Sequence, residues 1–323
     1  MNFKSYGDLS VDIAASLFSI QGKGYDLVVG VPRSGMIPAS MIALGLHIDV
    51  MGLPDFIANQ PLITRLRRRA GGQPSAAWDA RKVLLVDDSV VTGRTMQQAR
   101  DAIPGGCPCS IDTLAIYADP DGKQHVDIVL SIMQSPYIFQ WSLFAPAMLS
   151  QSCFDIDGVL CVDPTAQEND DGEQYVTFLN NAEPLFLPSA RIGCLVTNRL
   201  EKYRSQTVTW LEQHGIDYEH LVMLDLPSKE ERRRQGVHSS HKGLFYKNSD
   251  YIFFIESSPR QAGNIARISG KPVYCYEDNR VYTAEDKAPN KKGLRSFAKR
   301  FIRNTVNLLN LRHPVKAVKR KTG

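Results

Sequence analysis

The chain has 323 residues, about twice the length of a typical domain, so two hydrophobic cores are expected. Apolar residues make up 43% of it and charged residues 22%, a balance that excludes a disordered or membrane-embedded protein. The net charge of +4 is uneven: residues 291–321 contain eleven Lys or Arg and no acid, which leaves −7 on the remainder.

Neither a secretion signal nor a membrane span is expected. The N-terminus lacks a charged start followed by an apolar run, and no stretch approaches the roughly 18 apolar residues of a spanning helix. The six cysteines show no spacing typical of paired metal ligands. These features favour a protein of the reducing cytoplasm.

Strand, loop and helix follow one another twice in the first half of the chain. One apolar run ends in GVPRSG (residues 30–35) before a helical pattern, and a second, KVLLVDD, ends in Asp87 and Asp88 before a turn and another helix. Further strands are expected at 110–119 and 127–134. Such alternation predicts a mainly parallel sheet with its site at the carboxyl ends of the strands.

A second parallel α/β domain is expected after residue 148, where the pattern resets. Strands are predicted near 153–156, 192–199, 251–258 and 271–277, with helices at 207–215 and 259–269. The predicted fold is therefore two doubly wound parallel-sheet domains, at 1–148 and 149–286, followed by a basic amphipathic tail at 287–323.

The strand that ends in Asp87 and Asp88 leads into residues suited to a phosphorylated ribose. The two carboxylates would accept hydrogen bonds from ribose hydroxyls. The following turn would hold a phosphate dianion through its amides, its hydroxyls and the helix dipole. Its residues are Val91, Thr92, Gly93, Arg94 and Thr95.

The thirteen-residue string VLLVDDSVVTGRT resembles the signature of type I phosphoribosyltransferases. The resemblance implies binding of phosphoribosyl diphosphate (PRPP), with Arg33, Ser34 and Gly35 in a second loop that holds the diphosphate. Arg67–Arg69 fall where the family has a mobile loop, although a charge run is more often a solvated face. A helix-capping turn is the structural alternative for both loops.

A second acidic motif stands at the start of the second domain. Asp155 and Asp157 lie two residues apart at a predicted strand end, and Gly158 permits the turn that follows. Hydrolysis of a phosphate ester through a carboxylate needs a nucleophile, a proton donor, a cation for the phosphate and a further magnesium ligand.

The string FDIDGV resembles the first motif of the haloacid dehalogenase (HAD) superfamily. The resemblance makes Asp155 the nucleophile and Asp157 the general acid and base. Only about 36 residues separate Asp155 from the strand of Cys194, so any cap is small. Thr197 and Asn198 would bind the phosphoryl group with Lys242, for which Lys229 and Lys247 are the alternatives. The predicted Mg²⁺ ligands are Asp155, Asp157 and Glu256, the last at a motif that lacks the usual paired aspartates.

Together the two domains resemble the dual-domain ribofuranosyltransferases of bacterial surface-polysaccharide assembly. This resemblance implies transfer of 5-phosphoribose from PRPP to a glycan, with release of diphosphate, followed by hydrolysis of the 5-phosphate. The product would be a β-ribofuranosyl residue of an O-antigen or capsule. Asp88 is one possible base for the acceptor hydroxyl.

The tail has apolar residues at helical steps, from Leu294 to Leu309, and basic residues on its other faces. This pattern favours peripheral contact with an anionic inner-membrane surface, where a lipid-linked acceptor would lie. A helix docked on the second domain is the alternative. Nucleic-acid binding is not expected, because no aromatic or groove-reading residues support it.

Two other functions remain open from the sequence. The chain could join a phosphoribosyltransferase for a nucleobase or small molecule to a nucleotide phosphatase. It could also be a regulator in which the first domain only binds PRPP.

Overall fold

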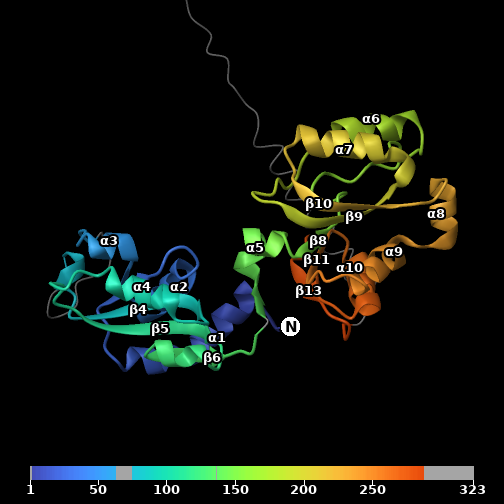
Figure 1. Cartoon of the computed structure of the whole chain (residues 1–323). Helices are drawn as coiled ribbons and strands as arrows, with labels where there is room; N and C mark the ends of the chain where they lie inside the picture. The colour runs from blue at the N-terminus through green and yellow to red at the C-terminus, as the bar shows by residue number, and fades with distance from the viewer. Residues whose placement is uncertain (1, 63–74, 136, 287–323) are drawn as a thin grey trace, which may run out of the picture. The chain divides into compact units, whose positions relative to one another are not determined.

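The computed structural model describes residues 2–62, 75–135 and 137–286. The chain forms two compact units, Met1–Leu143 and Phe144–Gly323 (Figure 1). The Arg67–Arg69 run and the tail at 287–323 lie outside the described residues. Among the helices that are described, none is long and apolar enough to cross a membrane.

A five-stranded sheet, parallel throughout, forms the centre of the first unit, with strand order β3-β2-β4-β5-β6. Its strands are β2 (Leu27–Gly30), β3 (Asp49–Gly52), β4 (Lys82–Val90), β5 (Ser110–Ala118) and β6 (Ile128–Ile132). Its helices are α1 (Tyr6–Gln21), α2 (Met36–Leu46), α3 (Leu53–Ile57) and α4 (Arg94–Asp101). A separate parallel pair joins β1 (Asn2–Lys4) to β7 (Tyr137–Phe139).

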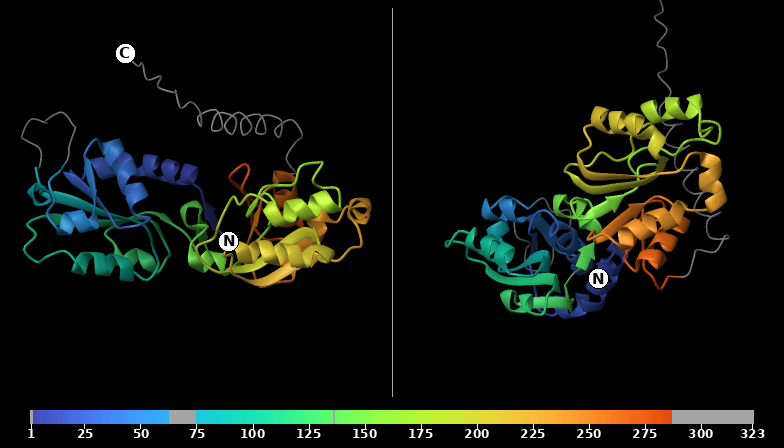
Figure 2. Two further views of the ribbon diagram at one scale, coloured as in Figure 1. Left: turned by 90° about the horizontal axis from the view of Figure 1, so that it is seen from above. Right: turned by 45° about the vertical axis from the view of Figure 1, so that its right-hand side comes forward.

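Both faces of this sheet are covered, as the turned views in Figure 2 show. Leu84 and Val86 of β4 join the core formed with α1 and α2, whereas Val83 and Leu85 join the core formed with α3 and α4. A strand buried on both faces reads as a continuous apolar run, which is why KVLLV predicted a central strand. The carboxyl end of β4 therefore lies in the middle of the sheet.

The second unit is built on a six-stranded sheet of order β10-β9-β8-β11-β12-β13. Its strands are β8 (Ser152–Phe154), β9 (Ile192–Leu200), β10 (Tyr218–Leu224), β11 (Phe253–Glu256), β12 (Val273–Cys275) and β13 (Arg280–Tyr282). Its helices are α5 (Pro146–Leu149), α6 (Glu173–Asn181), α7 (Arg204–Gln213), α8 (Lys229–Gln235), α9 (His238–Lys247) and α10 (Pro259–Ser269). The predicted boundary at residue 148 falls within α5.

The first five strands of this order are parallel, but the edge strand β13 pairs antiparallel with β12. The sequence did not predict β13, because three residues are too short for a visible period. α9 and α10 pack on one face of the sheet against a core that includes Cys153 and Cys194, and α6 and α7 lie on the other (Figure 1). One α-helix, α6, occurs between β8 and β9.

Candidate active sites

The loops after β2 and β4 meet at the carboxyl edge of the first sheet. These strands pair in parallel, and Ser34 Oγ donates a hydrogen bond of 3.0 Å to Asp88 Oδ1. Gly35 permits the approach, because a Cβ there would lie 2.7 Å from the Val86 carbonyl oxygen of β4. The peptide bond between Pro32 and Arg33 is cis, and Arg33 is exposed. The structure thus brings two predicted loops together across 54 residues of sequence.

Asp87 and Asp88 are both buried, with 6% and 7% of their surfaces exposed. Asp88 N donates to Asp87 Oδ1, and Trp141 Nε1 donates to Asp88 Oδ2 at 2.5 Å. Burial and repulsion from Asp88 raise the pKa of Asp87 to about 7. Among the described residues, no Lys or Arg forms an ion pair with either acid, so the pair retains uncompensated negative charge.

Trp141 is a site residue that the sequence did not single out. It stacks on Phe139 with ring centroids 4.8 Å apart, and Phe139 stacks on Tyr117. This stack holds the indole in place so that its N–H reaches Asp88. Both oxygens of Asp88 are thereby occupied by donors that lie 53 and 54 residues away in the sequence.

The turn after β4 has the form of an anion cradle. Thr92, Arg94 and Thr95 are exposed at the start of α4, whose first amides have no intrahelical acceptor. Gly93 has φ of 71°, and a Cβ there would lie 2.3 Å from His125 Cγ. Glycine is therefore required by backbone conformation and by the His125 ring. The exposed amides and hydroxyls suit the phosphate that the sequence predicted here.

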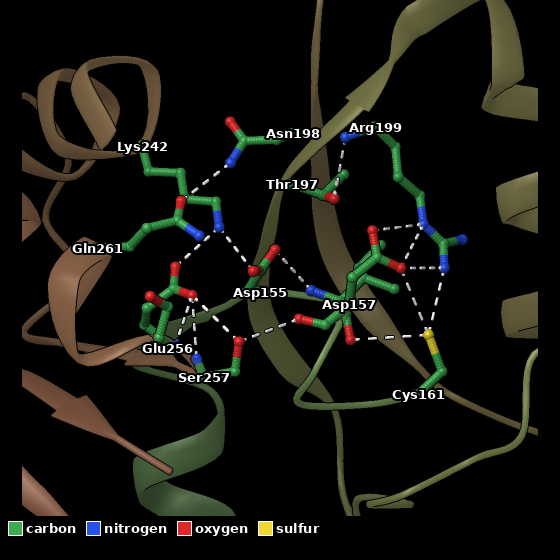
Figure 3. Close-up of polar contacts among 12 residues, drawn as sticks. Asp155, Asp157, Cys161, Thr197, Asn198, Arg199, Lys242, Glu256, Ser257 and Gln261 are labelled. Carbon is green, nitrogen blue, oxygen red and sulfur yellow. Dashed lines mark hydrogen bonds and ion pairs between the residues drawn. The ribbon is translucent and has the colours of Figure 1, made fainter. Parts of the chain in front are cut away.

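In the second unit, Lys242 lies between two acids (Figure 3). Its Nζ atom is 2.6 Å from Asp155 Oδ2 and 2.7 Å from Glu256 Oε2. The side chains of Lys242 and Glu256 are fully buried, and Asp155 is 4% exposed. Residues from the ends of β8 and β11 and from α9 thus form one polar cluster.

The charges in this cluster do not balance. Burial raises the pKa of Asp155 well above its usual range. The ammonium of Lys242 opposes this rise, while Glu256 and Asp157 add to it. Burial by itself would lower the pKa of Lys242, but the charges of Asp155 and Glu256 raise it, so the ammonium is retained.

The structure places Lys242, and neither of the two alternative lysines, in an ion pair with Asp155. Lys247 is exposed at the end of α9. Lys229 is buried, but its contact is through its main-chain N–H, which donates to Asp171. The helical step from Lys247 back to Lys242 turns the latter toward the sheet.

Asp157 binds an arginine that the sequence analysis missed. Arg199, fully buried, donates from Nη2 and Nε to Asp157 Oδ1 at 2.7 and 3.1 Å. Figure 3 shows this carboxylate turned toward Arg199 and Cys161, while its main-chain oxygen accepts from Ser257 Oγ at 3.4 Å. The signal was present, because Arg199 is two residues beyond Thr197 in β9 and alternate residues share a face.

Thr197 and Asn198 lie at the carboxyl end of β9 beside this cluster (Figure 3). Thr197 is fully buried, and its hydroxyl accepts from the main-chain N–H of Arg199 at 3.2 Å. Asn198 Nδ2 donates to Gln261 Oε1 at 3.2 Å, and its buried Oδ1 has no hydrogen-bond partner within the described chain.

The three predicted metal ligands do not form a cluster of carboxylates. Within the described ranges, no group of three or more His, Cys, Asp or Glu is placed to hold a metal ion. Asp157 directs its carboxylate to Arg199, and Lys242 lies between the other two acids. The oxygen donors of Asp155 and Glu256, with their one uncompensated negative charge, still suit a hard cation such as Mg²⁺.

Asp163 is a further acid near this cluster that no motif predicted. A Cβ at Gly158 would lie 2.9 Å from Asp163 Oδ2 and 2.4 Å from Ser257 Oγ. Loss of hydration raises the pKa of Asp163 to about 6, with repulsion from Asp157 and Glu256 contributing. The chain doubles back here, with Gly158 N donating to the Cys161 carbonyl, and this return is invisible in the sequence pattern.

Comparisons with known proteins concern the first of these sites. Residues 7–151 match the family model described as phosphoribosyl transferase domain. A xanthine-guanine phosphoribosyltransferase of Idiomarina loihiensis is 28% identical over 121 residues, which cover 37% of this chain and 72% of that protein. Its counterpart in Chromohalobacter salexigens is 27% identical over 144 residues, covering 43% and 82%. A purine phosphoribosyltransferase structure from Pyrococcus horikoshii aligns with 20% identity and a TM-score of 0.33, covering 44% of this chain and 95% of that chain.

The first domain is therefore of the phosphoribosyltransferase class. Residues 7–151 form an N-terminal type I phosphoribosyltransferase domain, which implies that PRPP is bound and that its phosphoribosyl group is transferred. Enzymes of this class typically use PRPP together with Mg²⁺. The chain continues beyond this match into a second parallel-sheet domain.

Proposed function

We propose that the chain is a bifunctional ribofuranosyltransferase. Its first domain would transfer 5-phosphoribose from PRPP to a hydroxyl of a glycan. Its second domain, a HAD-like phosphatase, would then remove the 5-phosphate. The observation that carries the second half of this proposal is the buried ion pair of Lys242 with both Asp155 and Glu256.

The first reaction needs negative charge near the ribose and donors near the phosphates. Asp87 and Asp88 would accept hydrogen bonds from the ribose hydroxyls, and the turn before α4 would hold the 5-phosphate. Arg33, exposed beside Ser34, would bind the departing diphosphate. The acceptor oxygen bonds to the anomeric carbon, the bond to diphosphate breaks, and the hydroxyl proton passes to a base such as Asp88.

In the second reaction, Asp155 would attack the phosphorus atom. The new bond joins a carboxylate oxygen of Asp155 to phosphorus, the ester bond to ribose O5 breaks, and that oxygen takes a proton from Asp157. Lys242 would neutralise charge on the phosphoryl oxygens, which Thr197 and Asn198 would also bind. Water then hydrolyses the aspartyl phosphate, with Asp157 accepting the proton, and Asp155 is restored.

Arg199 defines what Asp157 must do in this cycle. The carboxylate of Asp157 lies against Arg199, so it must leave this partner to exchange a proton with the leaving oxygen or with water. To act first as an acid it must carry a proton and turn from Arg199 toward the leaving oxygen. Mg²⁺, which Asp155 and Glu256 would hold, would supply positive charge for the phosphate oxygens.

The acceptor is proposed to be a glycan because the combination of domains leaves an unphosphorylated pentose. A surface polysaccharide that contains β-ribofuranose, such as an O-antigen or capsule, would need this net reaction. The basic tail at 287–323 would bring the enzyme to the inner membrane, where a lipid-linked acceptor lies. A cytoplasmic protein with peripheral membrane contact is the corresponding location.

A nucleobase acceptor is the second candidate. It is favoured by the names of the two relatives, both of which are xanthine-guanine phosphoribosyltransferases. In this case the phosphatase would convert the resulting nucleotide to a nucleoside. The two candidates share the donor and the phosphatase chemistry, and they differ in the acceptor.

One experiment separates the candidates and tests the order of the two reactions. The full chain and its Asp155→Asn variant are incubated with PRPP, Mg²⁺ and either ribose-free glycan fragments or purine bases, and the products are weighed by mass spectrometry. We expect glycan-dependent diphosphate release by both proteins, with the variant's product heavier by about 80 Da, the mass of a phosphoryl group. Release that depends on a purine would instead support the second candidate. Loss of transfer in a folded variant would contradict sequential action.

A further inference from the structure

A basic cavity of about 640 Å³ lies among α8, α9 and α10 of the second domain. Its lining includes Arg233 after the first turn of α8, His238 at the start of α9, and Arg260 and Arg267 on α10. Ser258 and Gln261 complete the side toward β11. No role in the reactions above uses this cavity.

The arginines of this cavity are uncompensated. The lining contains no acid. Arg233, Arg260 and Arg267 are exposed and form no ion pair within the described chain, although Arg267 Nη1 donates to Asn264 Oδ1 at 3.1 Å. Arg234 provides the contrast, because it pairs with Glu231 at 2.8 Å and does not line the cavity. Three guanidinium groups that share one cavity without a carboxylate form a site for an anion.

The surroundings of His238 agree with this charge distribution. Burial lowers the pKa of His238, and the positive charges of Arg232, Lys242 and Arg233 lower it further. These cations come from two different helices, and Arg260 adds a charge from a third. Lys242 is already paired with Asp155 and Glu256, so the positive charge that remains beside His238 comes from the arginines of α8 and α10.

The cavity adjoins the phosphatase cluster. Ser258 N donates to Glu256 Oε1 at 3.2 Å, and Gln261 Oε1 accepts from Asn198 Nδ2 at 3.2 Å. Figure 3 shows Asn198 and Gln261, the latter a residue of α10, beside Lys242. A ligand in the cavity would therefore lie next to the phosphate that Asp155 attacks.

A second cavity of about 640 Å³ near α6 has the opposite character. Its charged lining residues are Asp163, Glu168 and Glu183, and it contains no basic residue. Asp163 lies beside Gly158 of the phosphatase cluster, so this cavity also adjoins the site. An uncharged sugar could enter it, but an anion would be repelled.

We propose that the basic cavity binds a second phosphoryl group of the phosphatase's substrate. The second domain would then select a sugar phosphate that carries a further phosphate over one that carries a single phosphate. This inference rests on the proposed phosphatase function and adds a substrate class to it. The ribose that the first domain transfers carries only the 5-phosphate, so the further phosphate would belong to the acceptor.

Two simple sugars test the proposal. The full chain with Mg²⁺ is assayed for phosphate release from ribose 5-phosphate, which has one phosphate, and from ribose 1,5-bisphosphate, which has two. We expect kcat/KM to be about tenfold higher for the bisphosphate, since hydrogen bonds between charged groups are the strong ones. Phosphate release that is lost in the Asp155→Asn variant is assigned to the second domain.

Substitutions of the arginines that line the cavity test whether the preference for the bisphosphate depends on them. Arg260→Gln and Arg267→Gln should each raise KM for the bisphosphate about fivefold to tenfold, and leave hydrolysis of ribose 5-phosphate within twofold. Arg233→Gln should behave in the same way. Its neighbour Arg234→Gln is the matched control and should change neither substrate.

Three results would overturn the proposal. The first is equal kcat/KM for the two sugars, or equal effects of the variants on both. The second is an effect of inorganic pyrophosphate on ribose 5-phosphate hydrolysis that occurs in the wild type but not in Arg260→Gln. This result would mean that the cavity binds a separate anion and not a phosphate of the substrate. The third is no phosphate release from either sugar, which would also refute the phosphatase function itself.

Discussion

The two sites of this chain begin in the same way and differ in how their acids are neutralised. Each has acids at the end of a central parallel strand. At Asp87 and Asp88, the described chain supplies hydrogen bonds but no cation, and the pKa of Asp87 rises to about 7. At Asp155, a lysine is built into the fold. The first site therefore leaves its acids free to meet the hydroxyls of a ligand or a cation, whereas the second site carries part of its positive charge itself.

Removing the built-in cation should have the largest effect. Lys242→Met leaves Asp155 and Glu256 buried without a cation and removes the charge that would face the phosphate. We expect phosphate release from ribose 5-phosphate to fall about 10³-fold, while diphosphate release by the first domain is unchanged. Lys247→Met, an exposed change on the same helix, is the control. A loss below tenfold would mean that the Lys242 ion pair is structural.

Removing a carboxylate from the first site tests the other half of the comparison. Asp88→Asn keeps the shape of the side chain but removes its charge, so we expect the rate of transfer to fall about 10²-fold, as for loss of a general base. Trp141→Phe removes one donor to Asp88 and keeps the aromatic stack, so the rate should fall only severalfold. If the two variants were equally active, Asp88 would not be the base.

The glycine of the phosphate turn gives a smaller effect. Gly93→Ala must accept both a positive φ and a collision with His125, so we expect KM for PRPP to rise about tenfold. Gly24→Ala is the matched control, because Gly24 has φ of 72° but nothing within 4 Å of a Cβ. Gly24→Ala should lose only the stability that a positive φ costs, and Gly93→Ala should lose more because of the collision with His125. An equal change in KM would show that the turn does not hold the donor.

The smallest expected effect is on the pH dependence of stability. The pKa of Asp87 is raised from 3.8 to about 7 in the folded chain, so the folded form keeps a proton that the unfolded form has already lost. The stability that this proton contributes is fully present below pH 3.8 and is lost as pH rises through 7. The slope is at most about 1.4 kcal/mol per pH unit.

Melting temperatures at pH 5 and pH 8 measure this effect. The melting temperature of the first unit should fall between these values in the wild type, and by about 5 °C less in Asp87→Asn. Asp112→Asn is the control, since a hydrogen bond from Tyr25 lowers the pKa of Asp112. The contribution of Asp112 to the free energy of unfolding is therefore lost only on acidification below pH 3.8. An unchanged pH dependence in Asp87→Asn would show that Asp87 is ionised at pH 5.

Much of the fold followed from local patterns. The helix predicted at 259–269 coincides with α10, and β4, β5, β9 and β11 occur where apolar runs predicted strands. β10 and α6 were missed because their polar residues hide the period of the strand or helix, and β13 was missed because it has only three residues. β10 reads YEHLVML, and its first three residues include two that are exposed.

The sequence by itself determined which acids follow which strands, and that two parallel sheets carry them. These are properties of neighbouring residues, and the period of an apolar run reports them directly. Only the tertiary structure decided which lysine meets Asp155, that Arg199 binds Asp157, and that Trp141 binds Asp88. These contacts join residues that are 87, 42 and 53 positions apart, and no local period reports which distant side chains a packed sheet will bring within hydrogen-bonding distance.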